Sequence, residues 1–308
     1  MSLRLVAPVL LASLLAAQSA FGFCRTTTCD PGDPDDDCQR DAELCVVSGE
    51  PLSWRSSCVT IGVQRDGSPV NGFAFDDIVP VVEEAFAAWM NVDCGDDQRP
   101  SIDVQQLGPL ECDSSEYNSK ASNANIVLFV QEDWPYVGMG DALAITTTRF
   151  DTKTGALWDA DMEINATQVL SIGDPIPTGS ADLLSIITHE AGHFLGLSHS
   201  RDPEATMRTY YNPGHDGEDL RSLEPDDVAG ICEIYPPKRR VTTTSCENRH
   251  GFSEQCGADQ PPSNESKGCG CRLNARSGGS DGSGAGAALM IVLGAALRRR
   301  VAWRRRIV

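Results

Sequence analysis

Apolar positions along the middle of the chain follow two periods, and these periods predict strands and helices. Residues 59–65 alternate between apolar and polar side chains, which is typical of a strand with one buried face. The next segment is predicted to be a helix, because large apolar residues recur in it at helical spacing: Ile78, Val82, Phe86 and Trp89. We expect Asp76 or Asp77 to cap the N-terminus of this helix.

Further strands and two more helices are predicted after this first pair of elements. The strands are expected at four places: residues 101–107, 125–131, 142–150 and 157–165. The continuous apolar run at 126–130 is typical of a central strand that is buried on both faces. A turn at 151–155 joins the last two strands, and the helices are expected at 183–195 and 225–235.

The richest chemistry lies in residues 189–199, which follow the pattern H-E-x-x-H-x-x-G-x-x-H. His189 and His193 are four residues apart, so a helix places both on one face, one turn apart. Gly196 accepts a positive φ at no steric cost, which lets the helix end and the chain turn back with His199. Three histidines hold a zinc ion and leave its fourth position open, which indicates a catalytic rather than a structural metal site.

The complete motif resembles that of the metzincin zinc metallopeptidases, and the resemblance implies a secreted endopeptidase that acts on proteins or peptides. In that family the residue at Glu190 is the general base beside the metal. Met207, in the string Ala205-Thr206-Met207, resembles the methionine turn that forms an apolar floor beneath the zinc ligands. Ordinary core packing is the alternative for Met207 taken alone. A metzincin-like surface adhesin without catalysis is the alternative for the whole protein.

Two further strings resemble the matrixin branch of the metzincins. Ser200 directly follows the third histidine, and residues 223–231 contain the pair Asp226 and Asp227 at the start of a predicted helix. The resemblance implies that these carboxylates tie the helix to the methionine turn and to a freed chain terminus, although both also suit the positive end of a helix dipole. Over residues 58–237 it implies an α/β (α+β) fold, with a twisted, mostly parallel sheet, an antiparallel edge strand, an active-site helix and a C-terminal helix.

The resemblance also sets expectations for the sheet. It places residues 142–145 on the antiparallel edge strand above the cleft, where an extended peptide can pair with the backbone. Matrixins hold a structural zinc through additional histidines, but the only others here are His215 and His250, so we expect no second zinc of that kind. Three acidic residues alternate on the strand expected at 157–165, and they predict either a calcium site or a solvated strand face: Asp159, Asp161 and Glu163.

Both ends of the chain differ in composition from the middle. Residues 1–22 combine Arg4, an apolar run and small residues, and predict a secretory signal peptide. Residues 23–57 are rich in Cys and Asp and are expected to form loops, whereas residues 238–284 are rich in Cys, Gly and Ser and predict a linker. Residues 285–308 hold an apolar segment that is too short to span a membrane comfortably, followed by clustered arginines.

The C-terminal composition resembles the myxobacterial C-terminal sorting signal known as MYXO-CTERM. The string Gly268-Cys269-Gly270-Cys271, the short apolar segment and the arginine clusters carry this resemblance. It implies that a sorting protease cuts the tail and that the protein is displayed on the cell surface or outer membrane of a bacterium. The alternative is a simple membrane tail anchor.

Cysteine content and charge agree with export. Twelve cysteines predict disulfides in an oxidising compartment, and we expect one local pair between Cys94 and Cys112. The alternative for one cysteine of residues 23–57 is that its thiolate binds the zinc in a latent form of the protein. The net charge is −19 although the tail is basic, so the remaining chain is more acidic still and repels nucleic acid.

Overall fold

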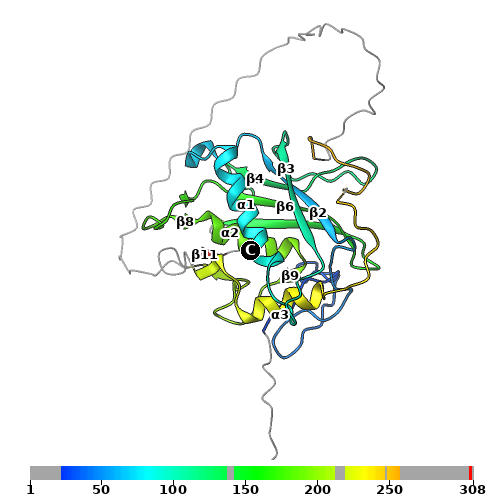
Figure 1. Cartoon of the computed structure of the whole chain (residues 1–308). Helices are drawn as coiled ribbons and strands as arrows, with labels where there is room; N and C mark the ends of the chain where they lie inside the picture. Colours follow the sequence, from blue (N-terminus) through cyan, green and yellow to red (C-terminus); the bar gives the residue numbers. More distant parts are fainter. Residues whose placement is uncertain (1–21, 137–141, 212–218, 247, 257–304, 307–308) are drawn as a thin grey trace, which may run out of the picture.

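The chain folds around a five-stranded mixed sheet with the strand order β3-β2-β4-β6-β5 (Figure 1). This computed structural model describes residues 22–136, 142–211, 219–246, 248–256 and 305–306. Four strands run parallel: β2 (Cys58–Gln64), β3 (Asp103–Leu110), β4 (Ile126–Val130) and β6 (Leu157–Asn165). The edge strand β5 (Ala144–Phe150) is antiparallel to β6, so the predicted α/β fold is confirmed.

Helix α1 (Phe75–Met90) connects β2 to β3 across one face of the sheet. The four apolar residues that predicted this helix are all buried, which confirms its core-facing side: Ile78, Val82, Phe86 and Trp89. The predicted cap was wrong, because the helix begins earlier and Ala74 is its N-cap. Asp76 and Asp77 lie in the first turn, where the Asp77 carboxylate accepts a hydrogen bond from Ala74 N at 2.9 Å.

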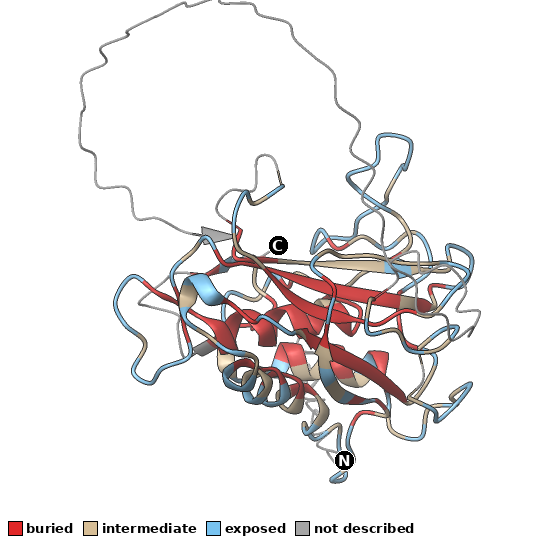
Figure 2. Cartoon of the chain, turned by 90° about the horizontal axis from the view of Figure 1, so that it is seen from above, coloured by how far each residue is buried: buried red, intermediate tan, exposed pale blue. Residues whose placement is uncertain are grey.

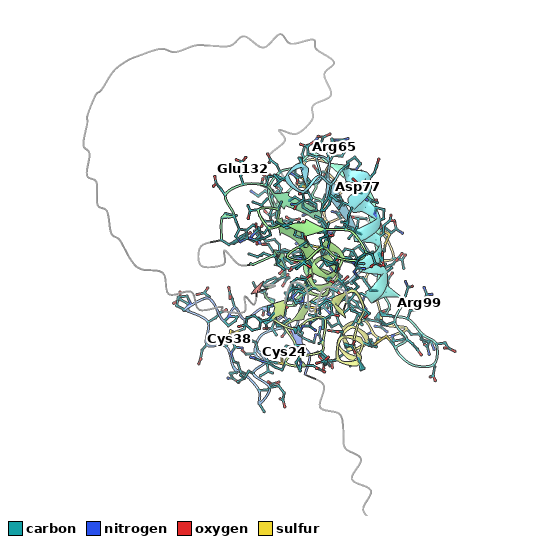
Figure 3. The ribbon with its side chains drawn as sticks, turned by 90° about the vertical axis from the view of Figure 1, so that its left-hand side faces the viewer. Cys24, Cys38, Arg65, Asp77, Arg99 and Glu132 are labelled. Atoms are coloured by element: carbon teal, nitrogen blue, oxygen red, sulfur yellow. A yellow bond between two sulfur atoms is a disulfide. The ribbon has the colours of Figure 1, made fainter. Side chains whose placement is uncertain are left out.

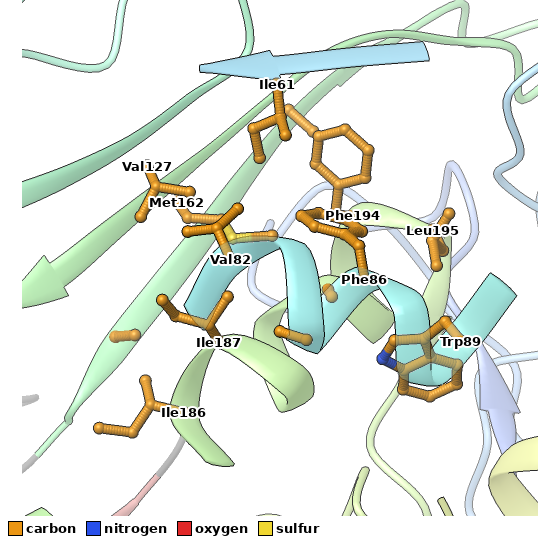
Figure 4. Packing of buried hydrophobic residues seen from close by; sticks show 14 of the residues in the cluster. Ile61, Val82, Phe86, Trp89, Val127, Met162, Ile186, Ile187, Phe194 and Leu195 are labelled. Atoms are coloured by element: carbon orange, nitrogen blue, oxygen red, sulfur yellow. The ribbon is translucent and has the colours of Figure 1, made fainter. Parts of the chain in front are cut away.

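Helix α2 (Leu183–Phe194) packs against α1 and on the same side of the sheet (Figure 1). Figure 4 shows how Val82 and Phe86 of α1 and Ile187 of α2 meet Ile61 and other residues of the sheet. Nearly all of α2 is buried, so its polar side chains are held in a mostly apolar surrounding. The buried residues gather in the sheet and between it and the helices, whereas exposed residues occupy the surrounding loops (Figure 2).

Helix α3 (Pro225–Ile234) completes the α-helical part of the described chain, and the remaining elements are short. Their bounds are η1 (Pro69–Asn71), β7 (Leu170–Ser171), β8 (Ala181–Asp182), β9 (Leu197–Ser198), β10 (Tyr210–Tyr211), η2 (Asp219–Arg221) and β11 (Arg305–Arg306). Strands β7 and β8 pair in parallel directly before α2, and β10 pairs antiparallel with β11.

The N-terminal segment is fastened to the loop that follows α2. Strand β1 (Cys24–Arg25) pairs antiparallel with β9, and Thr26 N donates to Gly196 O at 3.0 Å. Disulfides join Cys24 to Cys45 and Cys29 to Cys38 within the same segment. Figure 3 shows Cys24 and Cys38 at one end of the molecule, far from Arg65 and Glu132 at the other. The sequence did not predict this pairing, because a two-residue strand leaves no periodic pattern.

Three long-range disulfides close the rest of the body. Cys58 is joined to Cys246, and two further bonds replace the predicted local one: Cys94–Cys232 and Cys112–Cys256. The predicted Cys94–Cys112 pair is therefore wrong. Strand β3 lies between these two cysteines in the sequence. Its eight residues span roughly 26 Å at about 3.3 Å per residue, so Cys94 and Cys112 lie beyond opposite ends of the strand.

Residues 238–246 and 248–256 pack against the body. The Arg239 guanidinium donates to the carbonyl oxygens of Trp54 and Ser56 at 2.8 Å each. The Arg249 guanidinium lies 4.0 Å from the centre of the Trp158 ring. Contacts with the body thus continue past residue 237. Among the described residues, no helix has the length and apolar character needed to cross a membrane.

Candidate functional site

The motif helix is held firmly at both of its ends. At its start, the Asp182 carboxylate accepts Ser185 N at 3.0 Å and both arms of the Arg221 guanidinium, at 2.7 and 2.9 Å. At its other end, Gly196 has φ +101°, as the sequence predicted. A Cβ at Gly196 would lie 2.6 Å from Leu52 O, so only glycine allows this close turn.

The side chains of the three motif histidines converge on one point. His189 and His193 project from α2, and His199 follows β9. Ring centres are 4.9 Å apart for His189 and His193, 4.9 Å for His193 and His199, and 5.3 Å for His189 and His199. One ring nitrogen of each lies within 4.8 Å of the other two, so a single ion can contact all three.

Backbone carbonyl groups fix how two of the rings are turned. His189 Nδ1 lies 2.6 Å from Thr206 O, and His193 Nδ1 lies 2.9 Å from Leu197 O. A carbonyl oxygen only accepts, so each Nδ1 carries the hydrogen and each Nε2 presents a lone pair. Within the described residues, these two Nε2 atoms are buried and have no hydrogen-bond partner. The donor set therefore fits a zinc ion.

Burial also favours the neutral form of these rings. It lowers the pKa of His189 well below its usual value, with a smaller contribution from the neighbouring His193 and His199. Burial likewise lowers the pKa of His193, and the bond to Leu197 O opposes this. A neutral imidazole is the form that binds a metal, and burial favours that form at both rings.

Glu190 lies on the same helix, fully buried beside the histidines. Its Oε2 accepts a hydrogen bond from the Thr146 hydroxyl at 2.5 Å, whereas its Oε1 has no partner among the described residues. Burial raises the pKa of Glu190 to about 8, and the bond from Thr146 opposes this rise. A carboxyl group with a pKa near neutrality suits an exchange of protons with a substrate.

Met207 packs directly against the motif helix. It is fully buried, and a Cβ at Gly192 would overlap the Met207 sulfur and come within 2.9 Å of the Trp89 ring. The missing side chain at Gly192 therefore lets the methionine lie against α2 near His189 and His193. Sequence reasoning selected Met207 but missed Gly192, which falls on a variable position of the motif.

Two aspartates in the first turn of α3, Asp226 and Asp227, bind the segments that flank the histidine cluster. The Asp227 carboxylate accepts Thr206 N at 2.7 Å and Met207 N at 3.0 Å, and burial raises the pKa of this group. The Asp226 carboxylate accepts the Ser200 hydroxyl at 2.6 Å and also the backbone N–H of Gly22 and Phe23, at 2.5 and 3.0 Å. The carboxylates thus connect α3 to the methionine turn, to the residue after His199 and to the N-terminal segment.

The three acidic residues predicted to share a strand face are all on β6 and are all buried. Asp161 accepts the Ser115 hydroxyl at 3.0 Å and Ile126 N at 3.2 Å, and Glu163 accepts the Tyr136 hydroxyl. Asp159 Oδ1 has no hydrogen-bond partner in the described part of the chain. Because all three side chains are buried, this face of β6 is not the solvated strand face that was one of the two alternatives. The same burial raises the pKa of Asp159 and Asp161.

Two further residues at the site were not singled out from the sequence. Thr146 contacts Glu190 from β5, and Asp182 caps the motif helix. Threonine in a strand and aspartate before a helix are common, so neither position carried a distinctive signal. His215 and Cys269 to Cys271 lie outside the described residues, as do residues 1–21 of the predicted signal peptide and the predicted apolar tail segment.

Comparison with known proteins places this geometry in a family. The Matrixin family matches residues 53–236, which is more than half of the chain. Matrix metalloproteinase-C of Caenorhabditis elegans is 28% identical over 63% of this chain and 31% of its own length. Metalloendoproteinase 1-MMP of Arabidopsis thaliana is 33% identical over 66% of this chain and 50% of its own length. Human matrix metalloproteinase-16 is 36% identical over 26% of this chain and 13% of its own length.

The chain thus spans about half or less of the length of these relatives. The matched residues include all five strands of the central sheet, the three long helices and the histidine cluster. Matrixins are zinc-dependent metalloproteinases, and the donor set described above fits that metal. On these grounds the chain belongs to the matrixin family.

Proposed function

We propose that this protein is a zinc-dependent endopeptidase whose metal ligands are His189, His193 and His199. The observation that carries the proposal is the convergence of three imidazoles, of which two are already oriented by carbonyl groups at Nδ1. When bound, zinc supplies the Lewis acid that activates water and polarises a peptide carbonyl. His189 and Glu190 are fully buried, whereas His193 and His199 are partly exposed, so a substrate can reach the cluster from one side.

Glu190 moves the proton in this proposal. Its Oε2 is held by Thr146, and its Oε1 is left to accept a proton from the attacking water. The same oxygen then delivers the proton to the nitrogen of the departing amine, so that the peptide bond is replaced by a free acid and a free amine.

The substrate is proposed to be an extended segment of a protein or peptide. Strand β5 ends the sheet, and β6 is its only sheet neighbour in the described part of the chain. Its free edge presents backbone groups to which another extended chain can bind by antiparallel or parallel pairing. Thr146 contacts Glu190 from this strand, so a peptide on the free edge would lie near the histidine cluster.

Met207, Gly196, Asp226 and Asp227 are structural in this proposal. Asp227 holds the turn whose Thr206 carbonyl orients His189, and Met207 lies beneath the ligand helix. Removal of a signal peptide at residues 1–22 would turn the Phe23 nitrogen, 3.0 Å from Asp226 Oδ1, into a charged terminus. An ammonium group there would strengthen an existing hydrogen bond.

A calcium ion on β6 is a separate proposal for the same domain. Its support is the burial of Asp159, Asp161 and Glu163 together with the unpartnered Oδ1 of Asp159. A cation would balance the charge of carboxylates that burial otherwise keeps protonated. Calcium binding that is unchanged in an Asp159→Asn variant would place any such ion elsewhere.

Secretion and surface display are also proposed. The support is the sequence of both chain ends, together with five disulfides, a bond that forms and persists mainly in oxidising compartments. Expression with the native ends, followed by fractionation and mass spectrometry, tests this. We expect a surface-bound product that lacks residues 1–22 and has lost its tail near Cys269; a product with both ends intact in the cytoplasm contradicts it.

The test of the enzymatic proposal is the digestion of casein and a peptide library by the full chain. We expect a chelator to abolish cleavage and added zinc to restore it. A Glu190→Ala variant should retain one zinc ion per chain and lose cleavage. A zinc-loaded wild-type chain that cuts nothing would favour the catalytically silent binding protein, and cleavage retained in Glu190→Ala would remove Glu190 from the reaction.

A further inference from the structure

The only described hydrogen-bond partner of the Glu190 side chain comes from the edge strand rather than from the motif. The Thr146 hydroxyl lies 2.5 Å from Glu190 Oε2 and 3.4 Å from the backbone oxygen of the same residue. A hydroxyl has one hydrogen to donate, and the shorter contact assigns it to the carboxylate. The second carboxylate oxygen, Oε1, is buried without a partner in the described part of the chain.

Pairing on β5 fixes where Thr146 lies. Thr146 is paired with Met162 of β6, whose side chain is fully buried in the core. The next residue along, Thr147, points to the opposite face by strand alternation. On β6, Glu163 accepts the hydroxyl of Tyr136, which ties the chain before β5 to the sheet. Thr146 is therefore presented to α2 by a strand held along its length, and not by a loose loop.

We propose that Thr146 is a positioning residue for Glu190, and that it holds Oε2 so that Oε1 alone faces the substrate. The proposal rests on the proposed peptidase function. It links two parts of that function, because the strand to which a peptide would bind also orients the proton acceptor. A β-branched threonine suits this task, since its hydroxyl has few rotamers to lose in a strand.

The test compares Thr146→Val, Thr146→Ser and Thr60→Val in the zinc-loaded full chain. Valine keeps the shape of the side chain and removes the hydroxyl, whereas serine retains it. Thr60 is the matched control, because it is a buried threonine of the same sheet whose hydroxyl donates to the Asn248 side chain rather than to Glu190. Zinc content and thermal unfolding are measured for each variant beside kcat and KM.

We expect Thr146→Val to lower kcat roughly 10- to 100-fold with little change in KM, because a misplaced reacting group slows the chemical step. Thr146→Ser should recover most of the rate, and Thr60→Val should lose stability without losing kcat. All variants should bind one zinc ion. Wild-type kcat in Thr146→Val, or an equal loss in Thr60→Val, overturns the proposal.

A crystal structure of Thr146→Val gives a reading that is independent of activity. We expect the Glu190 carboxylate to leave its wild-type place or to occupy several places, and to return in Thr146→Ser. An unmoved carboxylate in Thr146→Val overturns the positioning role. A wild-type chain that binds zinc and cleaves nothing overturns the peptidase function instead, so the two failures are distinct.

Discussion

Single side chains in this domain act through the residues that they hold. Asp227 is the clearest case, because one carboxylate accepts N–H groups from Thr206, Met207 and Glu224. The Thr206 carbonyl in turn receives the Nδ1 hydrogen of His189. A helix-start acid that served only the helix dipole would make no such contacts with a distant turn.

Replacement of Asp227 by asparagine should therefore weaken both the fold and the metal site. An asparagine offers one acceptor oxygen and turns its amide donors toward other donors, so we expect a loss of about 2–4 kcal/mol in the free energy of unfolding. Zinc affinity should fall roughly 10- to 100-fold, as for other partners of metal ligands. Urea unfolding and competition with a chromophoric chelator measure the two effects.

The matched control for this substitution is Asp76→Asn. Asp76 is an exposed acid in the first turn of α1, so it represents a carboxylate that serves a helix start alone. If Asp227→Asn costs no more than Asp76→Asn in either measurement, the link from α3 to the methionine turn does not support the site.

The buried acids of β6 predict a pH dependence of stability. Burial raises the pKa of Asp159 and Asp161, so the folded chain retains protons that the unfolded chain releases above pH of about 4. Their contribution to the free energy of unfolding is largest at low pH and falls as the pH rises through the raised values. In the zinc-loaded chain without calcium, we expect Asp159→Asn to reduce the decline in Tm between pH 5 and pH 8.

Each proton that differs between the two states is worth roughly 1.4 kcal/mol for every pH unit. Differential scanning calorimetry at several pH values measures the slope, and millimolar calcium should flatten it in the wild type if the ion binds there. Parallel slopes for wild type and Asp159→Asn would show that Asp159 is not kept protonated by burial.

Helices and strands with strong periodic patterns were predictable, whereas their ends and their smallest partners were not. The buried residues of α1 recur at helical spacing, and β6 matches its predicted range of residues 157–165. The cap of α1 was wrong because Ala74, which is not a usual capping residue, takes that place and Asp77 acts from inside the first turn. The pairing of β1 with β9 involves two residues on each strand, which is too few for a period to show.

The contact between α2 and the methionine turn gives a prediction about close packing. Gly192→Ala would normally favour a helix by about 1 kcal/mol, but here the added methyl group meets Met207 and Trp89. We expect the variant to lose roughly 1–3 kcal/mol of stability through overpacking. Chemical denaturation measures the loss.

A second substitution separates this clash from other effects. Met207→Ala removes the side chain that the new methyl group meets, so Gly192→Ala should cost less in that background than in the wild type. Strictly additive losses in the double variant would show that the two positions do not compete for the same space.

Across the whole molecule, contacts within the motif were easier to predict than the long-range disulfides. Helix spacing predicted that His189 and His193 share one face, and a turn at Gly196 was needed to bring His199 back to them. Disulfide partners are far apart along the chain, and nothing in their spacing distinguished Cys94–Cys232 from a local pair. The contacts of residues 238–246 and 248–256 were not predictable from a periodic pattern. Two disulfides and side chains such as Arg239 attach these residues to the body, and no helix or long strand is involved.

Truncation tests the contribution of this C-terminal segment. A chain that ends after residue 240 loses the partners of Cys58 and Cys112, so two large covalent loops open. We expect its Tm to fall by roughly 6 °C or more relative to a chain that ends after residue 257, since a lost disulfide commonly costs about 2–5 kcal/mol. Zinc binding should persist at low temperature. Equal Tm values would mean that residues 241–256 do not stabilise the body.

The most direct test of the metal centre is an anomalous diffraction map at the zinc edge, from crystals grown with one equivalent of zinc. We predict a single strong peak bound by the Nε2 atoms of His189, His193 and His199, with Nδ1 of the first two still bonded to Thr206 O and Leu197 O. A peak at another place, or a ring of this triad turned away from the ion, would contradict the account.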